Sequence, residues 1–362
     1  MNLLVISNYR DPVSTRPEAE LFIRLHRQGV RVTIMTYPDA GYIHRFREMG
    51  LRVIPFHPEK KRHGPSIQRI RQELIEGKYD LLHLFNSKAI TNGIPAAKGL
   101  SVKVILYRGY TGNIHWYDPT AYWKYLHPRV DGIMCLADSV REHIQGNMFF
   151  GDKNKAVTIN KGHDPDWYAS IEPLDLTELG IPRGAFTLAC VANNRRMKGI
   201  PYLLEATHRI PVELPIHLIL VGNGMDIPPL RKIRQRSPNR AKIHLPGFRK
   251  DALQIVKAAD AFVLPSIKGE ATTKALLEAM SLGVAPIITD ISGNRGVVLQ
   301  QENGLVVPAR DPAQLARAMV YLYEHPELCR EYGEKASEHI RRRFHIDRTV
   351  SELKSFYEAL LR

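Results

Sequence analysis

The sequence is poor in cysteine and contains no long hydrophobic run. Its 362 residues include three cysteines, Cys135, Cys190 and Cys329, an odd number without metal-binding spacing. This argues against a disulfide scaffold, and we expect the reduced thiols of a cytoplasmic protein. No apolar stretch approaches the roughly 20 residues that a membrane-spanning helix needs. The apolar run 3–6 is too short for the core of a signal peptide, so we interpret it as a first buried strand.

Acidic residues are scarce relative to basic ones. The chain has 51 Lys and Arg against 37 Asp and Glu, a net charge of +14, with basic runs at 60–62, 231–240 and 341–343. Nucleic acid, an anionic membrane surface or an anionic substrate would explain this charge, and a solvated face explains each run equally well. There is no zinc-finger spacing, recognition-helix signature or aromatic RNA-binding motif, so we do not expect nucleic acid as a partner. Peripheral attraction to the inner face of a membrane would suit an enzyme of lipid-linked molecules.

The order of apolar runs predicts two α/β domains, and the chain length also favours two cores over one. In the first half we expect strands at 3–7, 30–35, 51–54, 81–85, 102–107 and 132–136, with helices at 17–28, 66–76 and 88–98. In the second half we expect strands at 186–191, 216–221, 242–245, 261–264 and 284–289, with helices at 200–209, 228–236, 250–258 and 272–281. Three further helices are expected at 312–324, 326–344 and 347–361. Such alternation predicts a doubly wound parallel sheet in each half. The expected domains are 1–164, with the final helix 346–362 packing back on it, and 165–345.

The most informative feature is a pair of carboxylates, Glu270 and Glu278, between two expected strands. Eight positions along a helix are a little over two turns, so both carboxylates fall on the same general side. Taken alone, two such glutamates are more often both solvated. The order of strand, loop, helix, glycine and strand favours a ligand site, because open α/β sheets bind ligands at the carboxyl ends of their strands. A helix N-terminus there also attracts an anion. The combination suits a ligand that is half sugar and half phosphate.

Three other loops follow expected strands of the second half. Arg195, Arg196 and Lys198 can neutralise a diphosphate, although a solvated basic loop is nearly as good an explanation. Gly222-Asn223 allows close approach of backbone to a ligand, or only a tight turn. Gly247-Phe248 offers a backbone edge to a planar base. Four such loops at consecutive strand ends predict the rim of one site.

This set resembles the retaining glycosyltransferases of family 4, which have the GT-B architecture of two Rossmann-like domains facing a cleft. The resemblance is good over roughly residues 185–325. The first half of the chain resembles the family mainly in its topology. The matching segments are 198–199, 203–206, 222–224, 245–248, 259–260, 264–266, 270–280 and 302–308.

The resemblance implies a role for each matching residue. Glu278 would accept hydrogen bonds from the ribose hydroxyls of a nucleotide sugar, and Glu270 would hold a hydroxyl of the donor sugar. Arg196 and Lys198 would stabilise the charge on the leaving diphosphate. The implied catalytic residues are thus Arg196, Lys198 and Glu270. The implied donor-binding residues are Arg195, Gly222, Asn223, Gly247, Phe248, Ala271, Thr272, Thr273 and Glu278, of which 271–273 would meet the β-phosphate. No Asp-x-Asp motif is placed to hold a metal, so neither a metal nor another cofactor is expected.

The sequence departs from the family pattern in both the donor-binding and the acceptor-binding parts. Ala271-Thr272-Thr273 stands where Gly-Phe-Gly is usual, and Arg108-Gly109 replaces a histidine that commonly follows a middle strand. Arg108, His115 and Asp118 cluster after the strand 102–107 and are candidates for the acceptor side. His115 or Asp118 could receive a proton from an acceptor, but a lone histidine is more often structural. In a front-face displacement the departing phosphate can take that proton instead.

The sequence therefore predicts a retaining, metal-independent glycosyltransferase that moves a sugar from a nucleoside-diphosphate sugar to a hydroxyl. The expected acceptor is a glycan or lipid-linked glycan of a cell-surface polysaccharide. Two alternatives remain open from sequence alone: a related nucleotide-sugar epimerase, or a basic nucleic-acid-binding or sugar-binding protein without turnover.

Overall fold

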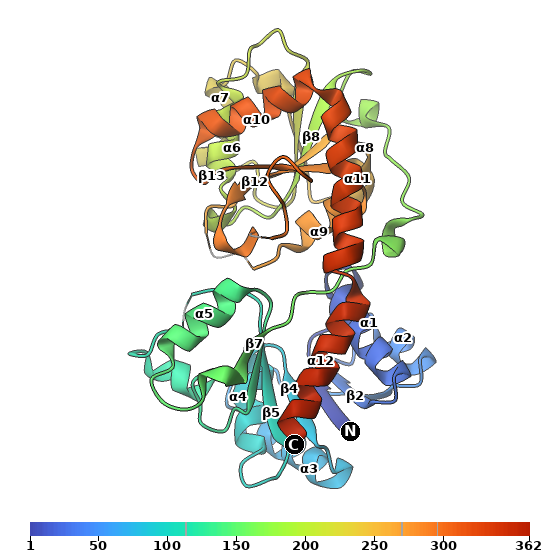
Figure 1. Cartoon of the computed structure of the whole chain (residues 1–362), viewed down its shortest axis with the longest axis vertical. Helices are drawn as coiled ribbons and strands as arrows, with labels where there is room; N and C mark the ends of the chain where they lie inside the picture. Colours follow the sequence, from blue (N-terminus) through green and yellow to red (C-terminus); the bar gives the residue numbers. More distant parts are fainter. Residues whose placement is uncertain (113, 269–270, 295) are drawn as a thin grey trace. The chain divides into compact units, whose positions relative to one another are not determined.

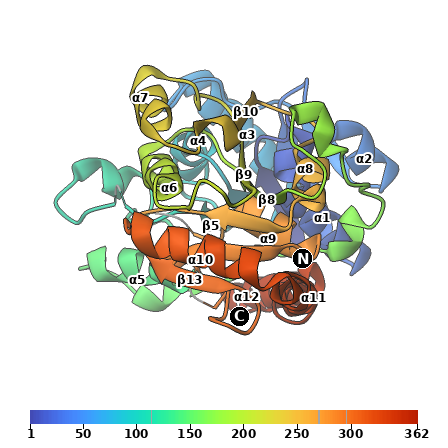
Figure 2. The same cartoon turned by 90° about the horizontal axis from the view of Figure 1, so that it is seen from above.

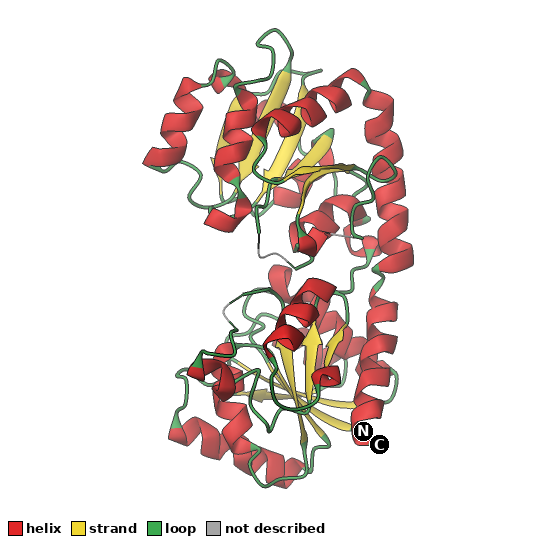
Figure 3. Ribbon diagram, turned by 60° about the vertical axis from the view of Figure 1, so that its left-hand side comes forward, coloured by secondary structure: helices red, strands yellow, loops and turns green. Residues whose placement is uncertain are grey.

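The computed structural model describes residues 1–112, 114–268, 271–294 and 296–362. The chain divides into two compact units: unit 1 comprises Met1–Gly162 and Phe344–Arg362, and unit 2 comprises His163–Arg343. In each unit a sheet of parallel strands is flanked by helices on both faces (Figure 3). The predicted fold class, two doubly wound Rossmann-like units, is therefore confirmed.

Unit 1 contains a seven-stranded parallel sheet of order β3-β2-β1-β4-β5-β6-β7 (Figure 1). Its strands are β1 (Asn2–Ile6), β2 (Arg31–Thr36), β3 (Arg52–Pro55), β4 (Leu81–Leu84), β5 (Lys103–Arg108), β6 (Gly132–Cys135) and β7 (Ala156–Thr158). Its helices are α1 (Pro12–Arg27), α2 (Ile43–Glu48), α3 (Gly64–Gly77), α4 (Ser87–Ala96), α5 (Asp138–Asn147) and α12 (Ile346–Leu361).

The last helix of the chain, α12, packs against α1 in unit 1 (Figure 1). The hydroxyl of the fully buried Tyr357 lies 2.6 Å from Nδ1 of His83 on β4. Near the start of α12, Arg24 forms an ion pair with Asp347. A buried polar contact to β4 and a surface ion pair to α1 are thus among the contacts that attach the end of the chain to unit 1.

Unit 2 contains a six-stranded parallel sheet of order β10-β9-β8-β11-β12-β13. Its strands are β8 (Phe186–Val191), β9 (Ile216–Val221), β10 (Ile243–Gly247), β11 (Ala261–Leu264), β12 (Ala285–Asp290) and β13 (Leu305–Pro308). Its helices are α6 (Ile200–Thr207), α7 (Pro228–Arg236), α8 (Ala252–Ala258), α9 (Lys274–Ser281), α10 (Pro312–Glu324) and α11 (Pro326–Arg343). The edge strand β13 is absent from the sequence prediction.

Side chains alternate between the two faces along the central strands, so unit 2 has a hydrophobic core on each side of its sheet. On β9, Leu218 and Leu220 belong to the larger cluster, which also includes side chains of α6 and α10. The intervening Ile219 and Val221 belong to a smaller cluster with Ile255 of α8. Because successive side chains point to opposite faces, both faces of this sheet are apolar and helices cover both. Helices α6 and α10 lie apart from α8 (Figure 2).

Six helices begin one to five residues away from their predicted starts, and two of these differences have a clear local cause. Helix α1 begins at Pro12 rather than Pro17, because the Asp11 carboxylate caps it by accepting from the N–H of Val13. Helix α9 begins at Lys274 rather than at residue 272, because Thr273 is extended and serves as its N-cap residue. Thr272 and Thr273 therefore precede the helix.

Candidate functional site

The candidate site lies at the carboxyl ends of the strands of unit 2. Strand β8 is bordered by β9 on one side and by β11 on the other, so the strand order changes direction between β8 and β11. Open α/β sheets bind ligands in the crevice at such a switch point. Among the described residues, segment 192–199 follows β8, and segments 265–268 and 271–273 follow β11, so they flank this switch point.

These two segments are in direct contact. Gly199 has a φ of +67°, and a Cβ atom there would lie 1.9 Å from the carbonyl oxygen of Pro265. The N–H of Ile267 donates to the carbonyl of Met197 at 2.8 Å. Glycine is therefore required at 199 both by the left-handed backbone and by the approach of the second loop.

The loop after β9 adjoins the loop after β8 equally closely. A Cβ atom on Gly222 would lie 1.8 Å from the carbonyl oxygen of Ala192. The N–H of Asn194 donates to the carbonyl of Asn223 at 2.9 Å, and the N–H of Asn223 donates to Oδ1 of Asn193 at 3.2 Å. Close backbone approach explains the glycine, and these two hydrogen bonds hold the loops in register.

The end of β10 completes the series. The N–H of Gly222 donates to the carbonyl of Gly247 at 2.8 Å. The next residue, Phe248, exposes 65% of its surface, which leaves an aromatic ring beside the loop. The structure thus joins the four predicted loops into one continuous rim, in the order β10, β9, β8 and β11.

The rim is positively charged beside the switch point. Arg196–Lys198 form a short 3₁₀ turn that leads through Gly199 into α6. Arg195 and Arg196 are exposed and Lys198 is half-buried. Over the described part of the chain, no carboxylate lies within 4.0 Å of Arg195 or Arg196. Their charge is therefore available to an anion.

Glu278 lies on the other side of the switch point and is buried on α9, with 8% exposure. The solvated alternative is therefore wrong for this carboxylate. Lys274, one helical turn earlier, donates to Oε1 of Glu278. Oε2 has no hydrogen-bond partner among the described residues. It is also not one of the fully buried side-chain atoms that lack a partner, so it keeps some accessible surface. This oxygen is therefore the one open to a ligand.

The residues before α9 are also largely buried. Ala271, Thr272 and Thr273 expose 4%, 7% and 8% of their surfaces. Glu270, the other member of the predicted pair, lies outside the described residues, so its implied role stays a prediction.

The acceptor-side candidates lie in unit 1 and show structural roles. Arg108 is buried, donates to the carbonyls of Tyr110 and Gly112, and lies 3.7 Å from the ring centre of Tyr110. Asp118 caps the 3₁₀ helix Pro119–Trp123 by accepting from the N–H and hydroxyl of Thr120.

The two candidate bases differ in their surroundings. The hydrogen bonds from Thr120 lower the pKa of Asp118, which makes this carboxylate a poorer proton acceptor. His115 is half-buried, and its ring stacks on Tyr117 with the centroids 5.1 Å apart.

The sequence analysis missed one member of the site, Lys274. The spacing of Lys274 and Glu278, four apart on an expected helix, was the available signal. Among the residues that the structure describes, no three His, Cys, Asp or Glu side chains gather into a group that could hold a metal ion.

Two doubly wound units, one of which carries a glycine-containing cationic rim at its switch point, define an α/β protein of the class that binds its ligands at the carboxyl ends of its strands. Comparison with known proteins identifies the family. A sequence model for glycosyl transferases group 1 matches residues 173–339, and one for glycosyltransferase family 4 matches residues 19–167. The chain belongs to the family 4 glycosyltransferases.

Individual relatives agree with this assignment. The chain is 29% identical over 68% of its length to the uncharacterised glycosyltransferase MJ1069 of Methanocaldococcus jannaschii, and the match spans 63% of that protein. It is 27% identical to a phosphatidyl-myo-inositol mannosyltransferase of Mycobacterium tuberculosis, over 91% of this chain and 88% of the relative.

Among solved structures, Anabaena Alr3699/HepE in complex with UDP and glucose superposes with a TM-score of 0.81. The match has 17% identity and covers 99% of this chain and 100% of that one. Such a likeness shows the GT-B fold, as expected from the sequence.

Proposed function

We propose that this glycosyltransferase moves a sugar, with retention of anomeric configuration, from a nucleoside-diphosphate sugar to a hydroxyl of a glycan or lipid-linked acceptor. The proposal includes a role in cell-surface polysaccharide synthesis at the inner face of the membrane. The observation that carries it is the joined rim of unit 2, with exposed guanidinium groups and the open carboxylate oxygen of Glu278 on opposite sides of one switch point. The relatives named for mannosyl transfer and the fold shared with a UDP-bound protein support it.

Each part of the donor has a chemical counterpart on the rim. The diphosphate would bind Arg196 and Lys198 and the backbone that precedes α9, where N–H groups and the helix dipole favour an anion. A ribose hydroxyl would donate to Oε2 of Glu278, while Lys274 keeps Oε1 in place. The base would lie along the Gly247-Phe248 edge, where the exposed ring can cover its face.

The proposed reaction needs no protein nucleophile. The bond between the anomeric carbon and the leaving phosphate oxygen breaks, and the acceptor oxygen forms its bond to that carbon on the same face. The acceptor proton passes to the departing diphosphate. Because negative charge grows on the diphosphate, Arg196 and Lys198 stabilise the transition state, and one such contact is typically worth about 2.7–4 kcal/mol. These cations would take the part that a metal plays elsewhere, which is the basis for proposing metal independence. Glu270 would position the donor sugar.

The two units would divide the work. Unit 2 would bind the donor and unit 1 the acceptor, with Arg108 shaping the loop that also carries His115. The lowered pKa of Asp118 agrees with proton transfer to the departing phosphate rather than to this carboxylate.

The donor site is tested by calorimetry with UDP, GDP, ADP and their glucose and mannose conjugates. For the nucleotide that binds the wild type, Glu278→Ala should weaken binding about 10-fold to 100-fold, because a hydrogen bond to a charged group is worth about 1.5–3 kcal/mol. Glu205→Ala, which removes an exposed glutamate of α6, is the matched control and should bind as the wild type does. Unchanged affinity in Glu278→Ala would contradict the ribose-binding role.

The mechanism is tested by product analysis. NMR of the glycoside formed should show the anomeric configuration of the donor, and turnover should persist in excess EDTA. An inverted product would refute retention, and activity restored only by a divalent cation would refute metal independence.

A further inference from the structure

Unit 1 exposes a group of large aromatic side chains on two neighbouring loops. We call Trp116, Tyr117, Phe149 and Phe150 the aromatic patch; they expose 52%, 66%, 64% and 84% of their surfaces. The rings of Trp116 and Phe149 are in contact, with centroids 5.2 Å apart. The N–H of Trp116 also donates to Oδ1 of Asn147, the last residue of α5. The loops after β5 and α5 thus present their rings together, and such a cluster commonly marks an interaction surface.

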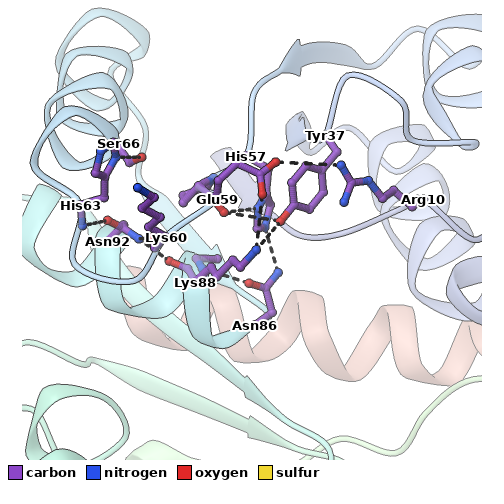
Figure 4. A network of polar contacts seen from close by, with 12 residues as sticks. Arg10, Tyr37, His57, Glu59, Lys60, His63, Ser66, Asn86, Lys88 and Asn92 are labelled. Atoms are coloured by element: carbon purple, nitrogen blue, oxygen red, sulfur yellow. Dashed lines mark hydrogen bonds and ion pairs between the residues drawn. The ribbon is translucent and has the colours of Figure 1, made fainter.

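A second exposed feature of unit 1 is the basic loop, defined as Lys60, Lys61 and Arg62. Fully buried Asn92 of α4 holds this loop, because its Oδ1 accepts from the N–H of His63 and its Nδ2 donates to the carbonyl of Lys60, both at 2.8 Å (Figure 4). Arg62 keeps a left-handed φ of +49°, which is unfavourable for a residue with a side chain. The loop is therefore fixed rather than merely solvated.

The charge of the basic loop is unpaired, in contrast to that of its neighbours. Arg10 forms an ion pair with Asp39. Lys88 forms one with Glu59 (Figure 4). Over the part of the chain that the structure describes, no carboxylate lies within 4.0 Å of any cation of the basic loop. Three exposed positive charges thus remain for a partner.

Trp123 connects the two features. The Arg62 guanidinium lies 4.4 Å from the centre of the Trp123 ring, which is 49% exposed. Trp123 ends the 3₁₀ helix Pro119–Trp123, only seven residues after Trp116. With a rise of about 2 Å per residue in this helix, the two Cα atoms lie at most about 18 Å apart. Cations and aromatic rings therefore occupy one region of unit 1.

We propose that this region of unit 1 binds the surface of an anionic phospholipid bilayer. Trp and Tyr favour the headgroup level, and the two phenylalanines, which have no polar group, suit the acyl boundary below it. The basic loop complements the negative surface potential of such a membrane. This binding deepens the proposed function, on which it rests for its purpose: it would bring the enzyme to the surface that holds a lipid-linked acceptor.

The test is co-sedimentation of the purified full-length protein with sucrose-loaded vesicles, in the absence of any nucleotide sugar. Vesicles of phosphatidylglycerol and phosphatidylcholine should bind the protein, and vesicles of phosphatidylcholine alone should bind it much less. Phe149→Ser/Phe150→Ser should weaken binding at least tenfold, because two buried rings are lost. Lys61→Glu should weaken it more than the roughly fivefold expected for the loss of one cation, and high salt should do the same.

Two matched controls separate the surface from general effects. Ile75→Ser removes a side chain of α3 that is 54% exposed, and Arg69→Glu reverses an exposed charge of the same helix. Both variants should bind vesicles as the wild type does. Equal binding to both kinds of vesicle, or equal loss in the control variants, would overturn the proposal.

Two other occupants give distinct results. If the double phenylalanine variant turns a dimer into a monomer in sedimentation velocity, the patch is a subunit interface and the proposal is wrong. If soluble glycans displace the protein from vesicles, the rings form a sugar platform and the proposal is also wrong. Donor binding by calorimetry is measured without lipid, so failure of vesicle binding leaves the transferase proposal standing. Vesicle binding is measured without donor, so failure of donor binding leaves the membrane surface standing.

Discussion

The contact between Gly199 and Pro265 offers a way to disturb catalysis without removing any charged group. In a Gly199→Ala variant the new Cβ atom would start 1.9 Å from the Pro265 carbonyl oxygen, far inside van der Waals contact. The two loops would have to separate by roughly 1 Å or more to restore an ordinary contact distance. Because Lys198 and Arg196 lie on one loop and the residues before α9 follow the other, this separation displaces the cations from the helix N-terminus.

The expected loss follows from that displacement. A misplacement of about 1 Å at a catalytic group can lower the rate about 100-fold. The hydrogen bond from Ile267 to Met197 would also be strained, which adds about 1 kcal/mol of destabilisation to the left-handed penalty of roughly 1–2 kcal/mol for alanine.

Gly180→Ala is the matched control. Gly180 has a similar φ of +73°, but nothing lies within 4 Å of its Cβ position. Both variants are compared by thermal unfolding and by the steady-state release of nucleoside diphosphate. Gly180→Ala should lose only stability, whereas Gly199→Ala should also lose about 100-fold in turnover. Equal turnover in the two variants would refute the assignment of the β8–β11 switch point as the catalytic centre.

Three further outcomes are expected. Lys198→Ala should lower turnover about 100-fold or more but donor affinity far less, because the lysine charge stabilises the leaving group. Lys250→Ala, at an exposed position, is the control and should leave turnover near that of the wild type. Tyr357→Phe should destabilise unit 1 by about 1–3 kcal/mol in chemical denaturation, because it removes the buried hydroxyl beside His83, whereas Tyr321→Phe at a 37% exposed site should change little. Burial lowers the pKa of His83 to about 3, below its ordinary value near 6.5, so its contribution to stability is complete above pH 6.5 and is lost as the pH falls toward 3. Unfolding at pH 5 should show a loss of about 2 kcal/mol from this group, and a His83→Gln variant that keeps the same acid dependence would contradict this.

Periodic apolar strands allowed the fold to be predicted from sequence. The central strands β8 and β9 were predicted at their observed bounds because they are buried on both faces and read as continuous apolar runs. Strand β13 was missed because its four residues, Leu305–Pro308, end in proline at the edge of the sheet, where the pattern is short. The start of α1 was misjudged for a related reason, since Pro17 is tolerated inside the helix while Asp11 supplies the cap.

The candidate site was predictable in its parts but not in its contacts. Strand-end loops follow from topology, so Gly222, Gly247 and the cationic segment could be assigned to one edge. The pairing of Lys274 with Glu278 depends on side-chain geometry that spacing only permits. The acceptor-side role of Arg108 stays a prediction, and its hydrogen bonds to two backbone carbonyls of its own loop depend on a local fold that spacing does not reveal.

The composition of unit 1 from two separated segments has a consequence for synthesis on the ribosome. Unit 2 is one continuous stretch, so it can finish folding soon after residue 343 has emerged. Unit 1 must wait for residues 344–362, because α12 buries Tyr357 beside a strand translated more than 250 residues earlier. Its first sheet is therefore the earliest part to be made and the last to be covered, and a nascent chain stalled before α12 should expose that surface to chaperones and proteases.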